Sequence, residues 1–206
     1  MSVLAPSAFQ THPSHPWTGV VLASGQSSRM GEDKALLLWE GKPLYQHMGG
    51  KLAQAGAEQV LINRGDVAAC REYGRVTDRI PGRGPLSGVH AALSVCKCAG
   101  LLVVPVDMPL LRPEHIAHLA RHFDGAHPVQ YQGYSLPLVL PVDKACVQAV
   151  DKAIHSDNRR HYALWRLFET LGGVTLPPPE DHAECFSNTN TPEEWQTCQA
   201  ASVTGQ

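Results

Sequence analysis

Short, uninterrupted runs of apolar residues recur along the first half of the chain. They lie at Thr18–Ala23, Gln59–Ile62 and Leu101–Val106, and a polar residue follows each of them. Runs of this length without polar alternation are typical of strands that are buried on both faces of a sheet. Two shorter segments, Ala35–Trp39 and Arg75–Thr77, also predict extended chain.

The segments between these runs predict helices at Pro43–Ala55, Pro85–Cys96 and Pro113–His122. Pro43 suits the first turn of the first helix, and Gly56 suits its C-terminal cap. Strands and helices that alternate in this way predict an α/β fold with a largely parallel sheet.

The pattern changes after residue 125. Pro128–Tyr131 and Leu136–Leu140 flank the dipeptide Gln132-Gly133, which predicts a hairpin. Pro137 has no amide hydrogen to donate, so we expect the second arm to be an edge strand or to contain a break.

The C-terminal part predicts three helices, at about 142–154, at about 160–171 and from Thr191 onward. Thr191 can cap the last of these, Pro192 fits its first position, and Glu194 closes a capping box. In the second helix, helical spacing places three residues in the core: Leu164, Trp165 and Phe168.

Composition places the chain among single-domain globular proteins. Of its 206 residues, 43% are hydrophobic and 17% are charged, which is enough apolar material for a sizeable core. The formal net charge of -2 argues against nucleic-acid binding through bulk basic charge. No apolar run approaches the roughly 18 residues of a membrane span. We therefore expect one domain over residues 17–206, with neither a nucleic-acid nor a membrane partner.

The N-terminal residues and the cysteines bear on the compartment. Residues 1–16 are rich in Pro, Ser and His and lack the basic start and apolar centre of a secretory signal, so they predict a flexible leader. The six cysteines contain no C-x-x-C pair. Scattered cysteines without a signal are typical of reduced thiols in a cytoplasmic protein, with a disulfide framework as the alternative.

The loop from Leu22 to Lys34 holds the most informative residues. A buried strand delivers it to the carboxyl edge of the sheet, where open α/β folds bind ligands. Gly25 and Gly31 allow backbone N–H groups to face an anion, while Arg29 and Lys34 supply two cations. The loop matches neither a Walker A motif nor G-x-G-x-x-G. It predicts a phosphate-binding loop, with a solvated surface turn as the alternative.

Residues 22–37 read L-A-S-G-Q-S-S-R-M-G-E-D-K-A-L-L. This string resembles the signature of nucleotidyltransferases with a glycosyltransferase-A-like Rossmann fold. Within that superfamily the chain is most similar to the molybdenum cofactor guanylyltransferases of the MobA type. Four further stretches match them in order, and with the loop they span residues 19 to 194: Gly41-Lys-Pro-Leu44, Gly84-Pro-Leu-Ser-Gly88, Val106-Asp-Met-Pro109 and Asn188-Thr-Asn-Thr-Pro-Glu-Glu194.

The resemblance implies a three-layer, Rossmann-like nucleotide-diphospho-sugar transferase fold, with a mostly parallel sheet and a hairpin insertion. It also implies a reaction in which GTP donates GMP to the terminal phosphate of molybdopterin and pyrophosphate leaves. GTP and molybdopterin are then the substrates and Mg²⁺ is the cofactor. Transient contact with other proteins of molybdenum cofactor synthesis is the protein partnership that the resemblance implies.

The resemblance also assigns roles to matching residues. Lys34 and Arg29 would act on the phosphates, and Asp107 would hold the Mg²⁺, so these three would be catalytic. The implied nucleotide-binding residues are Leu22, Ala23, Ser24, Gly25, Lys34, Asn63, Asp78 and Asp107. The implied acceptor-binding residues are Arg159, Arg160, Asn188 and Asn190.

Residue chemistry agrees with the nucleotide roles and leaves alternatives. Asp107 follows a buried strand, where its carboxylate can share Mg²⁺ with phosphate oxygens and water, although a turn before Pro109 would also favour aspartate. Without the resemblance, Asp78 would be a turn residue or a partner for Arg79, and Asn63 would only end a strand. The attacking phosphate oxygen is already anionic near pH 7. No general base is therefore required, and positioning and electrostatics would provide the catalysis.

The acceptor residues are more open to other interpretations. Arginine binds phosphate at two points, but Arg159 and Arg160 also suit a solvated first turn of a helix. Asn188 and Asn190 line the same pocket or only shape the turn before the last helix. Separately, three histidines share one helix face, which would suit a metal ion but is more often a wet surface: His115, His118 and His122.

Two residues depart from the family pattern. Ser24 stands where the guanylyltransferases usually have glycine and the cytidylyltransferases alanine, and Leu136 stands where the family has the histidine of a His-Pro pair. These departures keep open a CTP-dependent molybdopterin cytidylyltransferase, or a nucleotidyltransferase acting on a sugar or alcohol phosphate. A non-catalytic nucleotide-binding protein is the third alternative, but it predicts loss of Asp107 or Lys34, and both are present.

Overall fold

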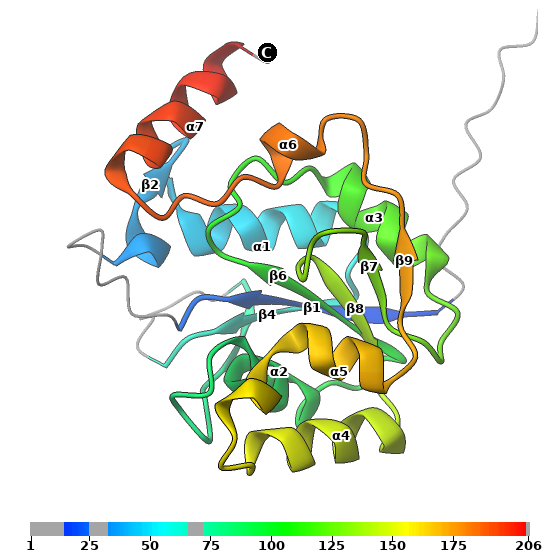
Figure 1. Ribbon diagram of the computed structural model, residues 1–206. Helices are drawn as coiled ribbons and strands as arrows, with labels where there is room; N and C mark the ends of the chain where they lie inside the picture. Colours follow the sequence, from blue (N-terminus) through cyan, green and yellow to red (C-terminus); the bar gives the residue numbers. More distant parts are fainter. Residues whose placement is uncertain (1–14, 25–32, 66–71, 205–206) are drawn as a thin grey trace, which may run out of the picture.

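The computed structural model describes residues 15–24, 33–65 and 72–204. A seven-stranded sheet with the order β5-β4-β1-β6-β8-β7-β9 forms the middle of the molecule. Helices α1, α3 and α6 lie on one face of this sheet, and α2, α4 and α5 lie on the other (Figure 1). The predicted three-layer α/β fold with a mostly parallel sheet is therefore confirmed.

Four parallel strands make up one half of the sheet: β1 (Trp17–Leu22), β4 (Gln59–Asn63), β5 (Gly74–Val76) and β6 (Gly100–Pro105). The first five residues of both β1 and β6 are buried. Two separate apolar clusters, one on each face of the sheet, cover these strands. The uninterrupted apolar runs thus have the cause expected for them, which is burial on both faces.

The predicted hairpin is built into the other half of the sheet. Its arms are β7 (Val129–Tyr131) and β8 (Leu138–Pro141), and β8 runs antiparallel to β6 on one side and to β7 on the other. Of the two outcomes expected for Pro137, the break is confirmed, because the strand begins only at Leu138. The edge strand is wrong, because β8 pairs with β6 and with β7. Pro137 precedes the first paired residue of β8, so the ladder does not need its missing N–H.

The predicted helices are largely confirmed, with ends shifted by a few residues. They are α1 (Leu44–Gln54), α2 (Pro85–Leu93), α3 (Pro113–His122), α4 (Lys144–Ile154) and α7 (Pro192–Thr204). The capping box of α7 is present, because the Glu194 N–H donates to Thr191 Oγ1 and the Thr191 N–H donates to Glu194 Oε2. Trp195 of α7 packs edge-on against Trp39, with ring centroids 5.3 Å apart.

Three predictions for local structure are wrong. Residues 160–171 are not one helix, because extended backbone at Ala163 separates a 3₁₀ turn, η2 (Arg159–Tyr162), from α5 (Leu164–Thr170). Trp165 is 45% exposed, while Leu164 and Phe168 are buried as expected. The segment predicted as extended at 35–39 starts instead as a 3₁₀ turn, η1 (Lys34–Leu36), followed by the short β2 (Leu38–Trp39) and β3 (Lys42–Pro43).

Two elements were not predicted, namely β9 (Val174–Leu176), which pairs with β7, and the short helix α6 (His182–Cys185). The flexible leader stays a prediction, since its residues 1–14 lie outside the described ranges. Of the cysteines within those ranges, all five are free thiols. None of the described helices is long and apolar enough to cross a membrane.

Candidate active site

The carboxyl ends of β1, β4 and β6 meet at one edge of the sheet, beside a cavity of about 630 Å³. The parallel register sets these ends next to one another, with Leu22 beside Asn63 on one side and beside Pro105 on the other. Eight of the residues predicted for the site line this cavity: Leu22, Ala23, Ser24, Lys34, Asn63, Asp78, Asp107 and Asn190. The predicted residues Gly25 and Arg29 lie outside the described part of the chain.

Three side chains form a polar network at the β1–β4 end of the cavity. The Ser24 hydroxyl lies 2.9 Å from Asn63 Oδ1 and 3.1 Å from Asp78 Oδ2, and the Asn63 amide donates to Asp78 Oδ1 at 2.8 Å. Asn63 itself is buried. Hydrogen bonds to protein groups therefore fix the orientation of the Asn63 side chain. The Ser24 hydroxyl, which a glycine would lack, is directed toward Asn63 and Asp78.

The segment Gly84-Pro-Leu-Ser-Gly88 closes the same end of the cavity. A side chain at Gly88 would overlap Asn63 Oδ1 and Leu22, so glycine lets α2 pack closely beneath the network. Gly84 has a φ of 59°, which favours glycine, and Pro85 opens the helix. The buried Ser87 hydroxyl donates to the Ile80 carbonyl at 2.7 Å and so holds the preceding turn against α2.

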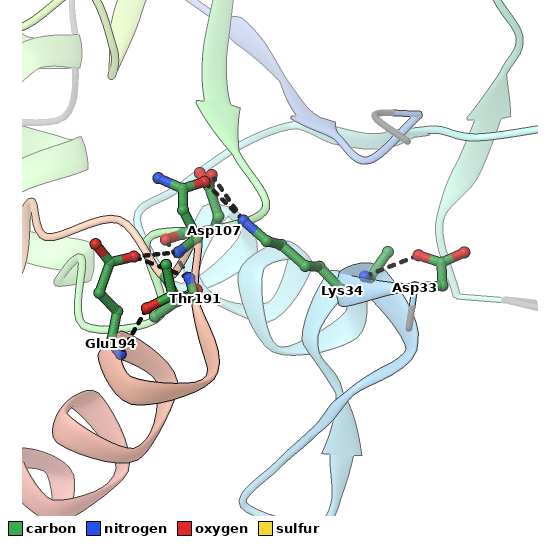
Figure 2. A network of polar contacts seen from close by, with 8 residues as sticks. Asp33, Lys34, Asp107, Thr191 and Glu194 are labelled. Atoms are coloured by element: carbon green, nitrogen blue, oxygen red, sulfur yellow. Dashed lines mark hydrogen bonds and ion pairs between the residues drawn. The ribbon is translucent and has the colours of Figure 1, made fainter. Parts of the chain in front are cut away.

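Lys34 and Asp107 lie at the other end of the cavity, together with a residue from the C-terminal segment. Lys34 Nζ donates to Asn190 Oδ1 at 2.7 Å and lies 3.8 Å from Asp107 Oδ2. Figure 2 shows the lysine reaching the aspartate from η1. The Thr189 N–H also donates to the Asp107 carbonyl at 2.9 Å, so residues 189–190 are fastened to the end of β6. Lys34, Asp107 and Asn190 are far apart in the sequence, so their spacing alone could not predict these contacts.

The Asp107 carboxylate is mostly shielded from water but still faces the cavity. Burial raises its pKa above the usual range, and the positive charge of Lys34 opposes that rise. Its side chain keeps 24% of its exposure. A carboxylate oxygen is a hard donor. Asp107 therefore suits a divalent ion that also binds phosphate oxygens and water.

Arg64 is a site residue that the sequence interpretation missed. It is buried at the end of β4 and forms a two-point ion pair with Asp33, in which Nη1 lies 2.8 Å from Oδ1 and Nη2 pairs with Oδ2. The guanidinium group holds the pKa of Asp33 below its usual range. Asp33 also accepts the Ala35 N–H and so caps η1, the turn that bears Lys34. An arginine directly after a buried strand was the available signal, but its partner could not be recognised from spacing.

The residues predicted for the acceptor divide into two groups. Asn190 lines the cavity, whereas Arg159, Arg160 and Asn188 are exposed and are absent from its lining. The turn η2, which holds the two arginines, nevertheless lies close to the cavity-lining segment at residues 81–84, because the Arg83 guanidinium sits 4.6 Å from the centre of the Tyr162 ring. Leu136, the second departure from the family pattern, lines the cavity.

Comparisons with known proteins show the family and the fold of the chain. Residues 19–174 match the family model described as a MobA-like NTP transferase domain. The chain is 39% identical over 186 residues to a molybdenum cofactor guanylyltransferase from Xanthomonas euvesicatoria, covering 87% of this chain and 93% of that protein. It is 30% identical to another from Pseudomonas fluorescens, with 88% and 93% covered. The structure of molybdopterin-guanine dinucleotide biosynthesis protein A from Archaeoglobus fulgidus superposes with a TM-score of 0.73 at 21% identity, covering 91% of this chain and 99% of that one.

Proposed function

The chain belongs to the MobA-like NTP transferase family, and we propose that it transfers GMP from GTP to the terminal phosphate of molybdopterin, with release of pyrophosphate. The observation that supports this most directly is the gathering of Lys34, Asp107 and the Ser24 network around one cavity at the sheet edge. The names of the relatives favour GTP over CTP as donor and favour an enzyme over a non-catalytic nucleotide-binding protein.

The β1–β4 end of the cavity is suited to the nucleoside. Leu22, Ala23 and the network of Ser24, Asn63 and Asp78 offer an apolar wall beside fixed polar groups. Pre-oriented polar groups bind a base or ribose without the entropic cost of ordering them at each turnover. In our proposal the Ser24 hydroxyl acts on the nucleoside indirectly, because its neighbours Asn63 and Asp78 compete for it.

The opposite end is suited to the triphosphate. The Lys34 ammonium group is mostly buried, and burial strengthens its attraction for phosphate oxygens. Asp107 and the Asn190 amide oxygen supply hard oxygen donors next to it and would hold Mg²⁺ together with the phosphates. Bound Mg²⁺ supplies charge neutralisation for the triphosphate. We extend the phosphate role to Arg29 by family resemblance alone.

The reaction needs alignment more than proton transfer. An anionic oxygen of the molybdopterin phosphate forms a bond to the α-phosphorus of GTP, and the bond from that phosphorus to the bridging oxygen of the β-phosphate breaks. Pyrophosphate carries away the electron pair, and no proton has to move. Asn190 contacts Lys34 and so links the C-terminal segment to the phosphate end. Acceptor binding by Arg159, Arg160 and Asn188 stays a prediction.

Calorimetry combined with a transfer assay tests the proposal. We expect the protein to bind GTP with Mg²⁺ more tightly than CTP, and to convert molybdopterin and GTP into the guanine dinucleotide with release of one pyrophosphate. Lys34→Met should weaken GTP binding and reduce transfer, whereas Lys144→Met, which alters an exposed lysine of α4, should change neither. Tighter binding of CTP, or GTP binding that survives in Lys34→Met, would contradict the proposal.

A further inference from the structure

A second group of side chains with metal-binding chemistry lies between α3 and α6, outside the cavity described above. His115 comes from α3, Asp181 precedes α6, and Cys185 ends it. One nitrogen, oxygen or sulfur atom from each of the three lies within 4.8 Å of the others. The histidine stripe of α3 therefore does not behave as one wet face. His115 is buried, and His118 is partly buried and bonds to Tyr131.

Distances within this trio are short enough for the three to share one ion. His115 Nε2 lies 3.0 Å from Asp181 Oδ1, and Cys185 Sγ lies 3.2 Å from Asp181 Oδ2. Cys185 is 1% exposed, while the Asp181 side chain keeps 29% of its exposure. Two ligands are thus shielded, and the third provides a route for an ion to enter from solvent.

We propose that His115, Asp181 and Cys185 form a Zn²⁺ site. One nitrogen, one oxygen and one sulfur donor suit Zn²⁺, which accepts all three, and do not suit Mg²⁺, which requires hard oxygen ligands. Cys185 also lines a second cavity, of about 790 Å³, whereas His115 and Asp181 are absent from its lining, so the cavity borders the trio at the sulfur. A water would complete the coordination as fourth ligand. The donor set thereby separates this site from the one at Asp107.

The binding step balances without a further reactant. A bond forms between Zn²⁺ and Cys185 Sγ, the S–H bond breaks, and its proton passes to solvent. The lone pair of His115 Nε2 binds the ion, and the ring proton resides on Nδ1. Arg112, whose Nη1 lies 3.1 Å from Asp181 Oδ2, is more than half exposed and remains as a hydrogen-bond donor to the carboxylate. Such outer partners orient carboxylate ligands.

The position of the trio gives the ion a role in shaping the active site. Cys185 is five positions before Asn190 in the chain, and the intervening segment bonds to Asp107 through Thr189. An ion that joins α6 to α3 would fix the start of this segment. Asn190, at its far end, contacts Lys34. The alternative is that hydrogen bonds alone hold these three side chains together and that they bind no ion.

Cobalt binding distinguishes the two descriptions. Full-length protein is stripped with a chelator and titrated with Co²⁺ in excess Mg²⁺, which occupies hard oxygen sites. We expect one equivalent of Co²⁺ to give a near-ultraviolet thiolate-to-cobalt band that Zn²⁺ abolishes. Cys185→Ser keeps a hydroxyl donor for Asp181 but removes the sulfur, so the band should vanish and Zn²⁺ affinity should fall by more than about 100-fold. Cys146→Ser, at another buried free thiol, is the matched control and should keep the band.

A stability measurement supports the spectroscopy. Zn²⁺ should raise the thermal midpoint of the wild type and of Cys146→Ser, but not that of Cys185→Ser. If Cys185→Ser does not fold, Asp181→Asn replaces it, since the amide removes the anionic ligand and retains a polar group. Absence of the cobalt band from the wild type, or an unchanged band and midpoint shift in the substituted protein, would overturn the proposal in favour of the hydrogen-bonded arrangement.

Discussion

Asp33 and Asp107 lie on either side of Lys34, and their surroundings are opposite in kind. Asp33 meets the buried Arg64 guanidinium at two points and caps η1, so its oxygens are already occupied and its pKa is lowered. Asp107 is shielded, has Lys34 at 3.8 Å, and has a raised pKa. A carboxylate whose oxygens are hydrogen-bonded by protein groups fixes the local structure. A carboxylate that is shielded from water and only partly compensated by a nearby charge is available to bind a ligand.

The largest effect should come from the available carboxylate. We expect Asp107→Asn to lower kcat/KM for GMP transfer by about a thousandfold, the scale of losing a group that stabilises transition-state charge. The fold should persist, since an amide fills the same volume. Steady-state kinetics and a thermal unfolding curve test this, with the exposed Asp157→Asn as control. A similar loss of activity in Asp157→Asn would contradict the special role of the Asp107 carboxylate.

The anchoring carboxylate should show its effect first in stability. Asp33→Asn retains a good cap for η1 but leaves Arg64 without its charged partner. A fully buried pair would cost 3–5 kcal/mol, and since Asp33 is 37% exposed we expect about 2 kcal/mol. Transfer activity should fall by roughly ten- to a hundredfold because Lys34 loses its fixed support. Denaturant unfolding measures the first quantity, and unchanged stability would contradict the role of Arg64.

The sequence could not predict most of the difference between the surroundings of Asp33 and Asp107. The parallel strands and the Gly84–Gly88 segment were predictable because each depends on local patterning or on a short motif. The loop between Leu22 and Lys34 stays a prediction, since residues 25–32 lie outside the described ranges. The partners of Lys34 and Asp33 were not, because Asn190 and Arg64 reach them through the tertiary fold. The helix α6 was missed for a related reason. It has only four residues. Phe186, which directly follows it, packs against His115 and Tyr134, and these contacts rather than a periodic pattern hold the helix in place.

The contributions of Asp33 and Asp107 to the free energy of unfolding should depend on pH in opposite directions. For Asp33 the folded pKa is lowered, so its stabilising contribution is complete above the unfolded value of 3.8 and is lost as the pH falls through the lower folded pKa. For Asp107 the folded pKa is raised, so its contribution is complete below 3.8 and is lost as the pH rises through the higher folded pKa. Unfolding free energies of Asp33→Asn and Asp107→Asn, each compared with the wild type across these two windows, should therefore change in opposite directions.

The smallest effect should come from the nucleoside end, where neither region is altered. Ser24→Gly removes one member of the Ser24–Asn63–Asp78 network and introduces the glycine that the family resemblance predicts at this position. We expect a change of only a few fold in the KM for GTP, the size of one neutral hydrogen bond, with kcat preserved. Competition with CTP measures base preference. A reversal of that preference would assign base selection to Ser24 itself and contradict the indirect role proposed for it.

The contact between Lys34 and Asn190 joins residues 156 positions apart. A chain is made from its N-terminus, and domains begin to organise while they emerge from the ribosome. Lys34 is therefore synthesised long before Asn190, its hydrogen-bond partner. A nascent chain that has not yet reached Asn190 would hold Lys34 without this contact. The Lys34 end of the cavity is thus completed later than the end formed by Ser24, Asn63 and Asp78.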